Sequence, residues 1–304
     1  MAAPTLLYNR AFRHMLGTGS RPSPVKESKI MRKLSGQGRA KARPVVMAVV
    51  LLSIAVSAGC ANFLAGALTA GQAFLITPET EEAIGREAAA EFLRENTALR
   101  HESVQEEVRL VGRTISAVSS RPDAAYTFTA VEGETPNAFA LPGGPIFVTR
   151  PLLVRLTDEA QLAGVLAHEV AHVAHSHGIA QLRQALVLQG IAIATLGDQP
   201  DLLRRAAAIA LDLVLKGRGR AHEAQADTFG TRWMAAAGYE PAGVVDMLVM
   251  FQQMGDVPGY LVWASDHPAL ADRIRDVEGL IAQEGLGPGK RNAERYQQSM
   301  APLR

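Results

Sequence analysis

The chain has 304 residues, among them 31 Lys or Arg, 30 Asp or Glu and a single Cys. Residues 1–59 hold ten of the basic residues and one acidic residue, which leaves 21 basic and 29 acidic residues in the remainder. This acidic remainder excludes nucleic acid as an expected partner. A single Cys excludes an internal disulfide, so a hydrophobic core and any bound metal must stabilise the folded part, which is long enough for one substantial core.

The amino-terminal segment has the pattern of a secretory signal. A basic stretch, Arg32–Arg43, precedes an apolar run, Val45–Val56, and small residues then lead to Cys60. Over residues 31–59 the arrangement resembles a bacterial lipoprotein signal, in which cleavage leaves a lipid-modified Cys60 as the first residue. Residues 1–30 are then an upstream extension without a fold of its own.

An uncleaved membrane anchor is the alternative interpretation of the same segment. The stretch Val45–Gly71 is apolar enough to span a bilayer, with the basic side in the cytoplasm. Under both interpretations residues 60–79 include a linker, and the folded part lies on the periplasmic side of a bacterial cell envelope, attached to the membrane.

Two segments in the middle of the chain have the amino-acid composition of β-strands. Tyr126–Val131 and Ile146–Thr149 are rich in β-formers, and Pro142–Pro145 is a turn signal. A third strand through Ala138–Leu141 could expose its edge to an extended peptide, whose main chain would pair with it. An ordinary hairpin of the core sheet explains the pattern equally well.

An H-E-x-x-H motif follows, formed by His168, Glu169 and His172. Thr157 is the expected cap of its helix and Gly178 the expected stop, and apolar residues spaced along the segment predict one buried stripe. On a helix, residues four apart share a face, so both imidazoles can bind one cation. Zn²⁺ accepts such ligands and leaves a position for water, from which Glu169 can take a proton as general base.

The third ligand is not at the position that metzincins use, since their pattern requires His at 178 and this chain has Gly178. A second predicted helix, ending near Gly238, carries Glu223 and Asp227 four residues apart. One carboxylate can bind the metal while the other accepts the distal N–H of a ligand histidine and fixes its tautomer.

The segment between the two motifs, Ile179–Lys216, predicts two apolar helices with a break at Gly197–Pro200, each too short to cross a membrane. Packing, a lid over the cleft and contact with a bilayer all remain open for them. The carboxyl-terminal segment, 286–304, follows several helix breakers and offers little to bury, which predicts a mobile or loosely helical polar tail.

His267 precedes Pro268 at the expected start of a helix that runs towards Leu280. Neutral imidazole there can hydrogen-bond a developing oxyanion or bind zinc in a closed state, whereas a simple helix cap is the alternative. His177 is interpreted as structural. Arg220 and Arg273 could orient carboxylates or substrate, and solvated or structural roles are the alternative that is expected first.

Four sequence blocks together resemble the HtpX-like gluzincin family of zinc endopeptidases, which includes CAAX prenyl endopeptidases, mitochondrial OMA-type proteases and BepA- and LoiP-type envelope proteases. The blocks are Asn137–Gly144, Val165–His172, Arg220–Asp227 and His267-Pro268 with Arg273. They extend over a metallopeptidase domain of about residues 80–285. The resemblance implies an α+β, mostly helical zincin-like fold with a small sheet whose edge strand flanks the active-site helix.

The resemblance also implies one Zn²⁺ per chain and assigns roles. His168, His172 and Glu223 are the implied ligands, Glu169 the base, and Asp227 the residue that orients a ligand. The residues implied to bind substrate are Asn137, Ala138, Phe139 and Ala140.

The expected function is a zinc endopeptidase of the cell envelope that cleaves unfolded or misassembled proteins. A non-catalytic chaperone-like or binding protein on the same scaffold is the alternative. Retention of Glu169 favours the enzyme, because a binding module has no need of a general base.

Overall fold

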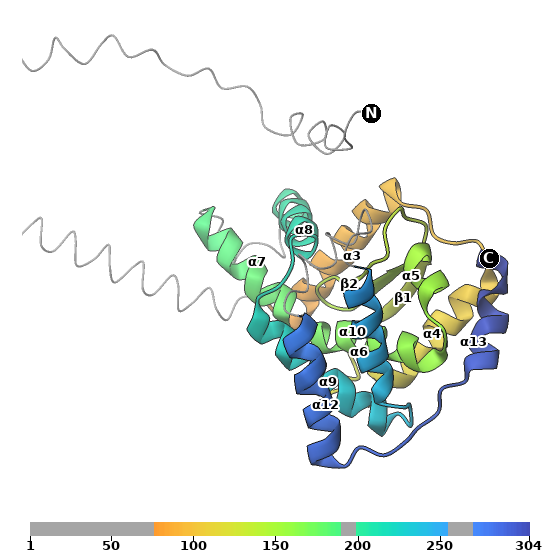
Figure 1. Ribbon diagram of the computed structural model, residues 1–304. Coiled ribbons are helices and arrows are strands. Elements are labelled where there is room, and N and C mark those ends of the chain that lie inside the picture. The colour runs from red at the N-terminus through yellow and green to blue at the C-terminus, as the bar shows by residue number, and fades with distance from the viewer. Residues whose placement is uncertain (1–75, 190–198, 255–269) are drawn as a thin grey trace, which may run out of the picture. The chain divides into compact units, whose positions relative to one another are not determined.

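The computed structural model describes residues 76–189, 199–254 and 270–304 (Figure 1). They form helices around one small sheet, as the α+β prediction requires. In chain order the elements are α3 (Pro78–Glu95), α4 (Glu102–Ser116), β1 (Thr127–Val131), β2 (Ala138–Ala140), β3 (Pro145–Thr149), α5 (Arg150–Arg155), α6 (Glu159–Ala174), α7 (His177–Leu188), α8 (Pro200–Val214), α9 (Arg220–Ala236), α10 (Ala242–Gln253), α12 (Leu270–Glu284), α13 (Ala293–Met300) and a 3₁₀ turn (Ala301–Leu303).

The sheet has the strand order β1-β3-β2. β1 pairs with β3 in parallel, and β2 pairs with β3 antiparallel through a hairpin. β2 is therefore an edge strand, and it also packs against α6. The predicted hairpin is thus present, and all three residues of its edge strand are buried, so pairing of this edge with a peptide stays a prediction.

Glycine is needed at the hairpin turn because the backbone there takes positive φ. Gly143 has φ +76° and Gly144 has φ +136°, a region that side chains with a Cβ rarely adopt. A Cβ on Gly144 would also lie 2.3 Å from the carbonyl oxygen of Ala125. The turn therefore requires glycine for two reasons, its positive φ and its close packing against the segment before β1.

Helices cover both faces of the sheet. Alternate residues such as Phe128 and Ile146 point to a core shared with α4, α6, α9 and α10, whereas Phe139 and Phe147 point to a second core with α3, α7 and α8. In the second core the rings of Phe139 and Phe147 lie 5.4 Å apart, and both contact Phe92 of α3. Both faces of the strands are consequently apolar.

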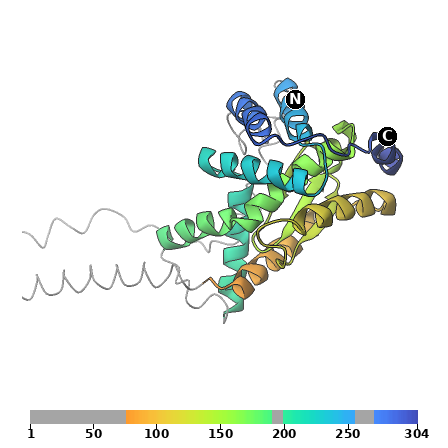
Figure 2. The ribbon, with the colours of Figure 1, turned by 90° about the horizontal axis from the view of Figure 1, so that it is seen from below.

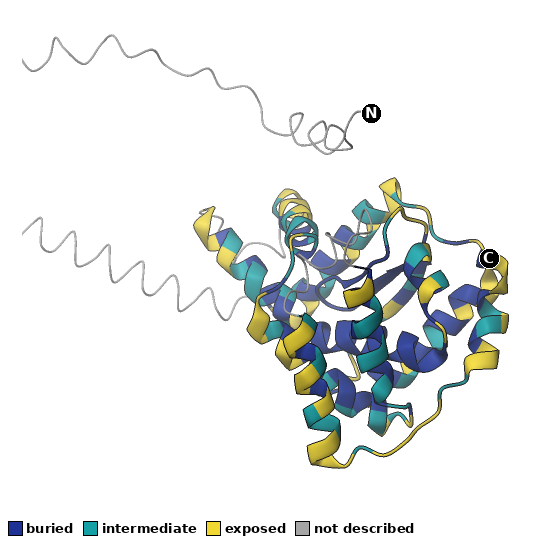
Figure 3. Ribbon diagram, in the orientation of Figure 1, coloured by how far each residue is buried: buried dark blue, intermediate teal, exposed yellow. Residues whose placement is uncertain are grey.

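α6 lies at the centre of the fold, against α4, α9 and α10 (Figures 2 and 3). The apolar residues of the predicted stripe are buried, and so is every other residue from Glu159 to Val173, so the helix is enclosed on all sides. Its cap is Asp158 and not Thr157, because Asp158 Oδ1 accepts the backbone N–H of Gln161 at 2.9 Å.

The predicted stop at Gly178 was also wrong. α6 ends at Ala174, Ser176 adopts the left-handed conformation with φ +53°, and α7 begins at His177. Gly178 lies within the first turn of α7, where an added Cβ would lie 3.4 Å from Pro142 Cγ of the hairpin turn. The reversal therefore comes two residues earlier and brings His177 back towards α6.

The carboxyl-terminal segment is not the loosely held tail that its polarity predicted. α13 buries Tyr296 and Met300, and Leu303 follows in the 3₁₀ turn. The hydroxyl of Tyr296 donates to the carbonyl of Leu153 at 2.7 Å. A few apolar residues at helical spacing thus suffice to dock the segment beside α4 and α6.

Within the described ranges, no helix combines the length and apolar character needed to cross a bilayer. The signal or anchor, Cys60 and nearly all of the linker lie outside those ranges, as does the first half of the break at Gly197–Pro200. α7 and α8 agree with the two helices expected between the motifs.

Candidate active site

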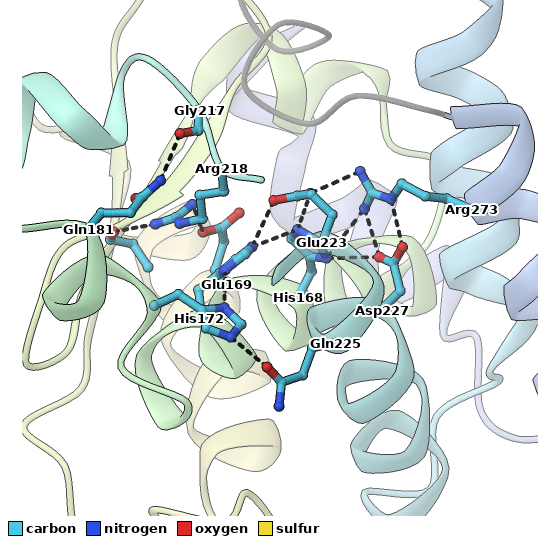
Figure 4. A network of polar contacts seen from close by, with 12 residues as sticks. His168, Glu169, His172, Gln181, Gly217, Arg218, Glu223, Gln225, Asp227 and Arg273 are labelled. Carbon is cyan, nitrogen blue, oxygen red and sulfur yellow. Dashed lines mark hydrogen bonds and ion pairs between the residues drawn. The ribbon is translucent and has the colours of Figure 1, made fainter. Parts of the chain in front are cut away.

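The two helices that carry the motifs, α6 and α9, pack side by side and bring three potential ligands together. Nε2 of His168 lies 3.0 Å from Nε2 of His172. The two Glu223 oxygens each lie 3.3 Å from one of these nitrogens. All three side chains are buried, and Figure 4 shows them turned toward one another.

This donor set fits Zn²⁺. In a tetrahedral site with bonds of about 2.0–2.1 Å, two donor atoms lie about 3.3–3.4 Å apart. The separation of the two imidazole nitrogens, 3.0 Å, and the distance from each Glu223 oxygen to its nearer imidazole nitrogen, 3.3 Å, are close to that value. Two imidazoles and one carboxylate are also the protein ligands of a catalytic zinc with an open fourth position.

α9 approaches α6 closely because Gly230 lies at their contact. A Cβ on Gly230 would lie 3.1–3.2 Å from backbone atoms of Ala167 and His168. Absence of a side chain at Gly230 therefore lets Glu223 and Asp227, on the same helix, reach the imidazoles of α6.

Asp227 holds the first ligand. Its Oδ1 lies 2.9 Å from His168 Nδ1, so Nε2 of His168 is turned towards Glu223. Although burial acts to lower the pKa of His168, the charge of Glu223 and the hydrogen bond with Asp227 outweigh it and raise that pKa to about 9. Burial likewise acts to raise the pKa of Asp227, but the Arg273 guanidinium and His168 hold it below its usual value.

Arg273 enters the site from α12. It is 5% exposed, so of the roles left open for it the solvated one is wrong, and it donates to both oxygens of Asp227 at 2.6 and 2.7 Å, the carboxylate-orienting role. Its Nη1 also lies 3.1 Å from a Glu223 oxygen. One guanidinium thus fixes both carboxylates of α9 (Figure 4).

His177 holds the second ligand. Its Nδ1 lies 2.8 Å from Nδ1 of His172, and its Nε2 lies 2.9 Å from Oε1 of Gln225. Burial, together with neighbouring cationic groups, lowers the pKa of His177 to about 4, and burial with Arg218 holds that of His172 well below its usual value. His177 is structural, as expected, and its contact is with the proposed metal ligand His172 itself. Its position five residues after His172 could have suggested this contact.

Glu169 is 2% exposed and follows the ligand His168 in α6. One of its oxygens, Oε2, lies 3.8 Å from Nη1 of Arg218, a residue that the sequence did not single out. Arg218 Nη2 donates to the carbonyl of Ala140 at 3.0 Å. This arginine thus joins the acidic side chain of the motif to the edge strand.

The edge-strand residues divide into two sets. Thr149 N donates to Asn137 O and Leu141 N to Pro145 O, so the main-chain groups of Asn137 and Phe139 point towards β3. Ladder alternation directs the main-chain groups of Ala138 and Ala140 away from β3. Phe139 places its side chain in one core with Phe147, and the side chains of Ala138 and Ala140 lie buried in the other core, so only main-chain groups of the alanines face away from β3.

The remaining predicted residues lie apart from the ligand set. His222 stacks on His177 with ring centroids 4.2 Å apart, and His175 stacks against Trp233. Arg220 is exposed at the start of α9. His267 lies outside the described residues.

A buried two-helix site with two histidines, one glutamate and an adjacent acidic residue defines a zincin-type metallopeptidase. The model of Peptidase family M48 matches residues 101–281, and the chain belongs to this family. The predicted resemblance to HtpX-like gluzincins is thereby confirmed.

The chain is similar both to mitochondrial metalloendopeptidases and to a bacterial protease named for beta-barrel assembly. The chain is 34% identical over 176 residues to the mitochondrial metalloendopeptidase OMA1 of Schizosaccharomyces pombe, with 56% of this chain and 51% of the relative covered. Its identity is 28% over 197 residues to the Danio rerio metalloendopeptidase OMA1, with 60% and 41% covered. A putative beta-barrel assembly-enhancing protease of Vibrio cholerae is 27% identical over 213 residues, with 64% and 43% covered. The chain thus spans about half the length of these relatives or less.

Proposed function

We propose that this chain is a zinc-dependent endopeptidase in which His168, His172 and Glu223 hold the metal and Glu169 is the general base. The observation that carries the proposal is the convergence of the three donor atoms within 4.8 Å of one another beside that carboxylate. Zn²⁺ in such a site polarises a peptide carbonyl and lowers the pKa of water.

The protein's own groups supply the rest of the chemistry. Glu169 accepts a proton from the attacking water and delivers it to the leaving nitrogen, the general-base and general-acid role of one carboxyl group. Asp227 and His177 hold the two ligand imidazoles in the tautomers whose Nε2 lone pairs face the metal. Burial of the whole cluster keeps these orientations fixed and strengthens each electrostatic contact.

Extended polypeptide is the proposed substrate class. The outward main-chain groups of Ala138 and the outward N–H of Ala140 lie on the edge strand that packs beside α6, and they can pair with a peptide backbone, while the Ala140 carbonyl accepts from Arg218. Such pairing recognises main chain, so unfolded or misassembled proteins fit better than a folded partner. A chaperone-like protein without activity gains no support, since the named relatives are proteases.

We further propose that the enzyme works in a bacterial cell envelope, attached to a membrane through a lipidated Cys60 or an uncleaved anchor. The lipoprotein-type sequence supports this location, as does the name of the Vibrio cholerae relative, which refers to beta-barrel assembly. Mass spectrometry of the protein purified from membranes distinguishes the two attachments, because only lipidation leaves an acylated amino-terminal Cys60.

The decisive experiment on activity compares the wild type with Glu169→Gln. The expected result is loss of casein cleavage by at least a thousandfold, because the base is removed, while about one zinc per chain is retained. Glu91→Gln is the matched control, since its carboxylate is partly exposed on α3 and pairs with Arg94. Casein turnover by Glu169→Gln at the wild-type rate would refute the assigned mechanism.

A further inference from the structure

Arg218 is a buried cation beside the candidate active site that the proposed chemistry does not use. Its side chain is 2% exposed. Gly217, with φ +91°, turns the chain just before it, and Gln181 Nε2 donates to the Gly217 carbonyl at 3.1 Å. The turn and this hydrogen bond direct the guanidinium inward before α9 begins (Figure 4).

Only part of the hydrogen-bonding capacity of this guanidinium is satisfied. Nη2 donates to the Ala140 carbonyl, and Nη1 lies 3.8 Å from Glu169, too far for a hydrogen bond. Nε is buried without a hydrogen-bond partner among the described residues. Because a buried unsatisfied donor is costly, its presence points to an acceptor that arrives with a ligand.

A small cavity adjoins the same guanidinium. It is bounded by Arg218, Ala140, Leu141, Pro142 and the ligand His172. Glu81 also borders it. The Glu81 carboxylate, however, accepts hydrogen bonds from Arg121 and from the backbone N–H of Gly143.

Because the Glu81 carboxylate already accepts these two hydrogen bonds, Arg218 is the charged side chain that a ligand beside Ala140 would contact. We propose that Arg218 is a specificity-determining residue, which binds an oxygen acceptor on the substrate residue next to Ala140 and favours an acidic over a basic side chain there. The inference rests on the proposed peptidase function, and it adds a preference that main-chain pairing with β2 cannot provide.

The physical reason is the fixed position of a positive charge in a buried site. A Lys or Arg side chain in the substrate would approach Arg218 with little screening by water, whereas Asp or Glu can accept its unsatisfied N–H. Glu169, whose Oε2 lies 3.8 Å from Nη1, stabilises the charge of the guanidinium without saturating its donors.

The test uses the full chain and an unstructured peptide whose cleavage site in the wild type is mapped by mass spectrometry. Each residue flanking the scissile bond is replaced in turn by Glu, Gln or Lys. At one of these positions the wild type is expected to show a kcat/KM for Glu at least ten times that for Lys. Equal rates at every position would overturn the proposal.

Two variants then assign the preference to Arg218. In Arg218→Gln the Glu-to-Lys ratio is expected to fall below threefold at that position only, with zinc content unchanged. In Arg218→Lys, which keeps the charge but loses the planar fork, Glu remains preferred while KM rises. Arg204→Gln, on the exposed surface of α8, is the control and should keep the wild-type ratio.

With both variants, the experiment can refute the role of Arg218 even if one of them does not fold. Retention of the wild-type ratio in Arg218→Gln would refute the role of Arg218 even though the enzyme remains a peptidase. If Arg218→Gln does not fold, the wild-type ratios together with Arg218→Lys still decide, because reversal of the preference in Arg218→Lys would contradict a charge effect. Absence of cleavage by the wild type would instead refute the proposed function itself.

Discussion

Arg273 donates hydrogen bonds to both carboxylate oxygens of Asp227, at 2.6 and 2.7 Å, and both side chains are almost fully buried. The pair links α12 to α9, and through Asp227 it reaches the imidazole of His168. A residue more than a hundred positions after the H-E-x-x-H motif thus fixes the orientation of a proposed metal ligand.

Replacement of Arg273 by Ala should therefore weaken both metal binding and the fold. We expect zinc affinity to fall about 10–100-fold, because Asp227 loses its orientation, and stability to fall by about 3–5 kcal/mol, because the Asp227 charge is left buried. Chelator competition measures the first effect and chemical denaturation the second.

Arg275→Ala is the control for this variant. Arg275 lies on the same helix but is 70% exposed and pairs with Asp272 at the surface. Such a pair contributes about 0–1 kcal/mol, so zinc affinity should not change. Equal zinc affinity in Arg273→Ala and Arg275→Ala would contradict the orienting role.

His177→Ala should lower zinc affinity about 10–100-fold with little effect on the fold, because His172 then loses the partner of its Nδ1. The measurement is competition with a zinc-binding dye. His101→Ala is the matched control: His101 is the N-cap residue that precedes α4, is exposed and makes no side-chain cap hydrogen bond. Wild-type affinity in His177→Ala would show that His172 keeps its orientation without this contact.

Gly230→Ala should separate α6 from α9. The added methyl group would lie 3.1–3.2 Å from backbone atoms of Ala167 and His168, and backbone cannot move aside as a flexible side chain can. We expect a loss of about 1–3 kcal/mol of stability together with weaker zinc binding. Thermal unfolding and zinc titration of the same sample would show whether both change together.

Gly279→Ala is the control, and its expected change in stability is opposite to that of Gly230→Ala. Gly279 is in α12, and a Cβ there would meet only Gln283 Nε2, at 3.8 Å. Replacement should stabilise the protein by about 0.5–1 kcal/mol, since Ala is the better helix former. If Gly230→Ala is stabilised as much as Gly279→Ala, the close contact of α6 and α9 is not what requires glycine.

Glu107 gives a pH-dependent prediction away from the ligand cluster. Burial and the charge of Glu159 raise its pKa, and the contacts with Arg295 and Ser299 offset this only in part. The ionised carboxyl is therefore less favourable in the folded protein than in the unfolded chain. Its cost is fully present above the folded-state pKa and disappears as the pH falls below the ordinary value of 4.5.

Glu107→Gln should accordingly be more stable than the wild type at pH 7.5, with a difference in melting temperature that shrinks towards pH 4.5. Melting curves at several pH values test this. Glu106→Gln is the neighbouring control, since Glu106 is exposed and the hydrogen bond from Arg109 lowers its pKa, so its replacement should not stabilise. A Glu107→Gln variant less stable than the wild type at every pH would contradict the prediction.

Local pattern was enough to predict the helices that carry the motifs and the hairpin. His168 and His172 share a face because their spacing matches a helical turn, and Pro142–Pro145 is a turn signal in any context. The cap at Asp158 was missed because Thr157 and Asp158 are both good capping residues, and only the hydrogen bond to Gln161 distinguishes them. The docked α13 was missed because Tyr296 is a single aromatic residue in a polar segment.

The sequence by itself determined the chemistry of this protein: the residue types of a zinc site, the acidic residue beside it and the strand that flanks it, since spacing along a helix or strand fixes which side chains share a face. Only the tertiary structure decided which partners hold that site. Arg218, Arg273 and His177 reach it through a turn at Gly217, the packing of α12 and the left-handed reversal at Ser176, and contacts between distant segments leave no periodic pattern in the sequence.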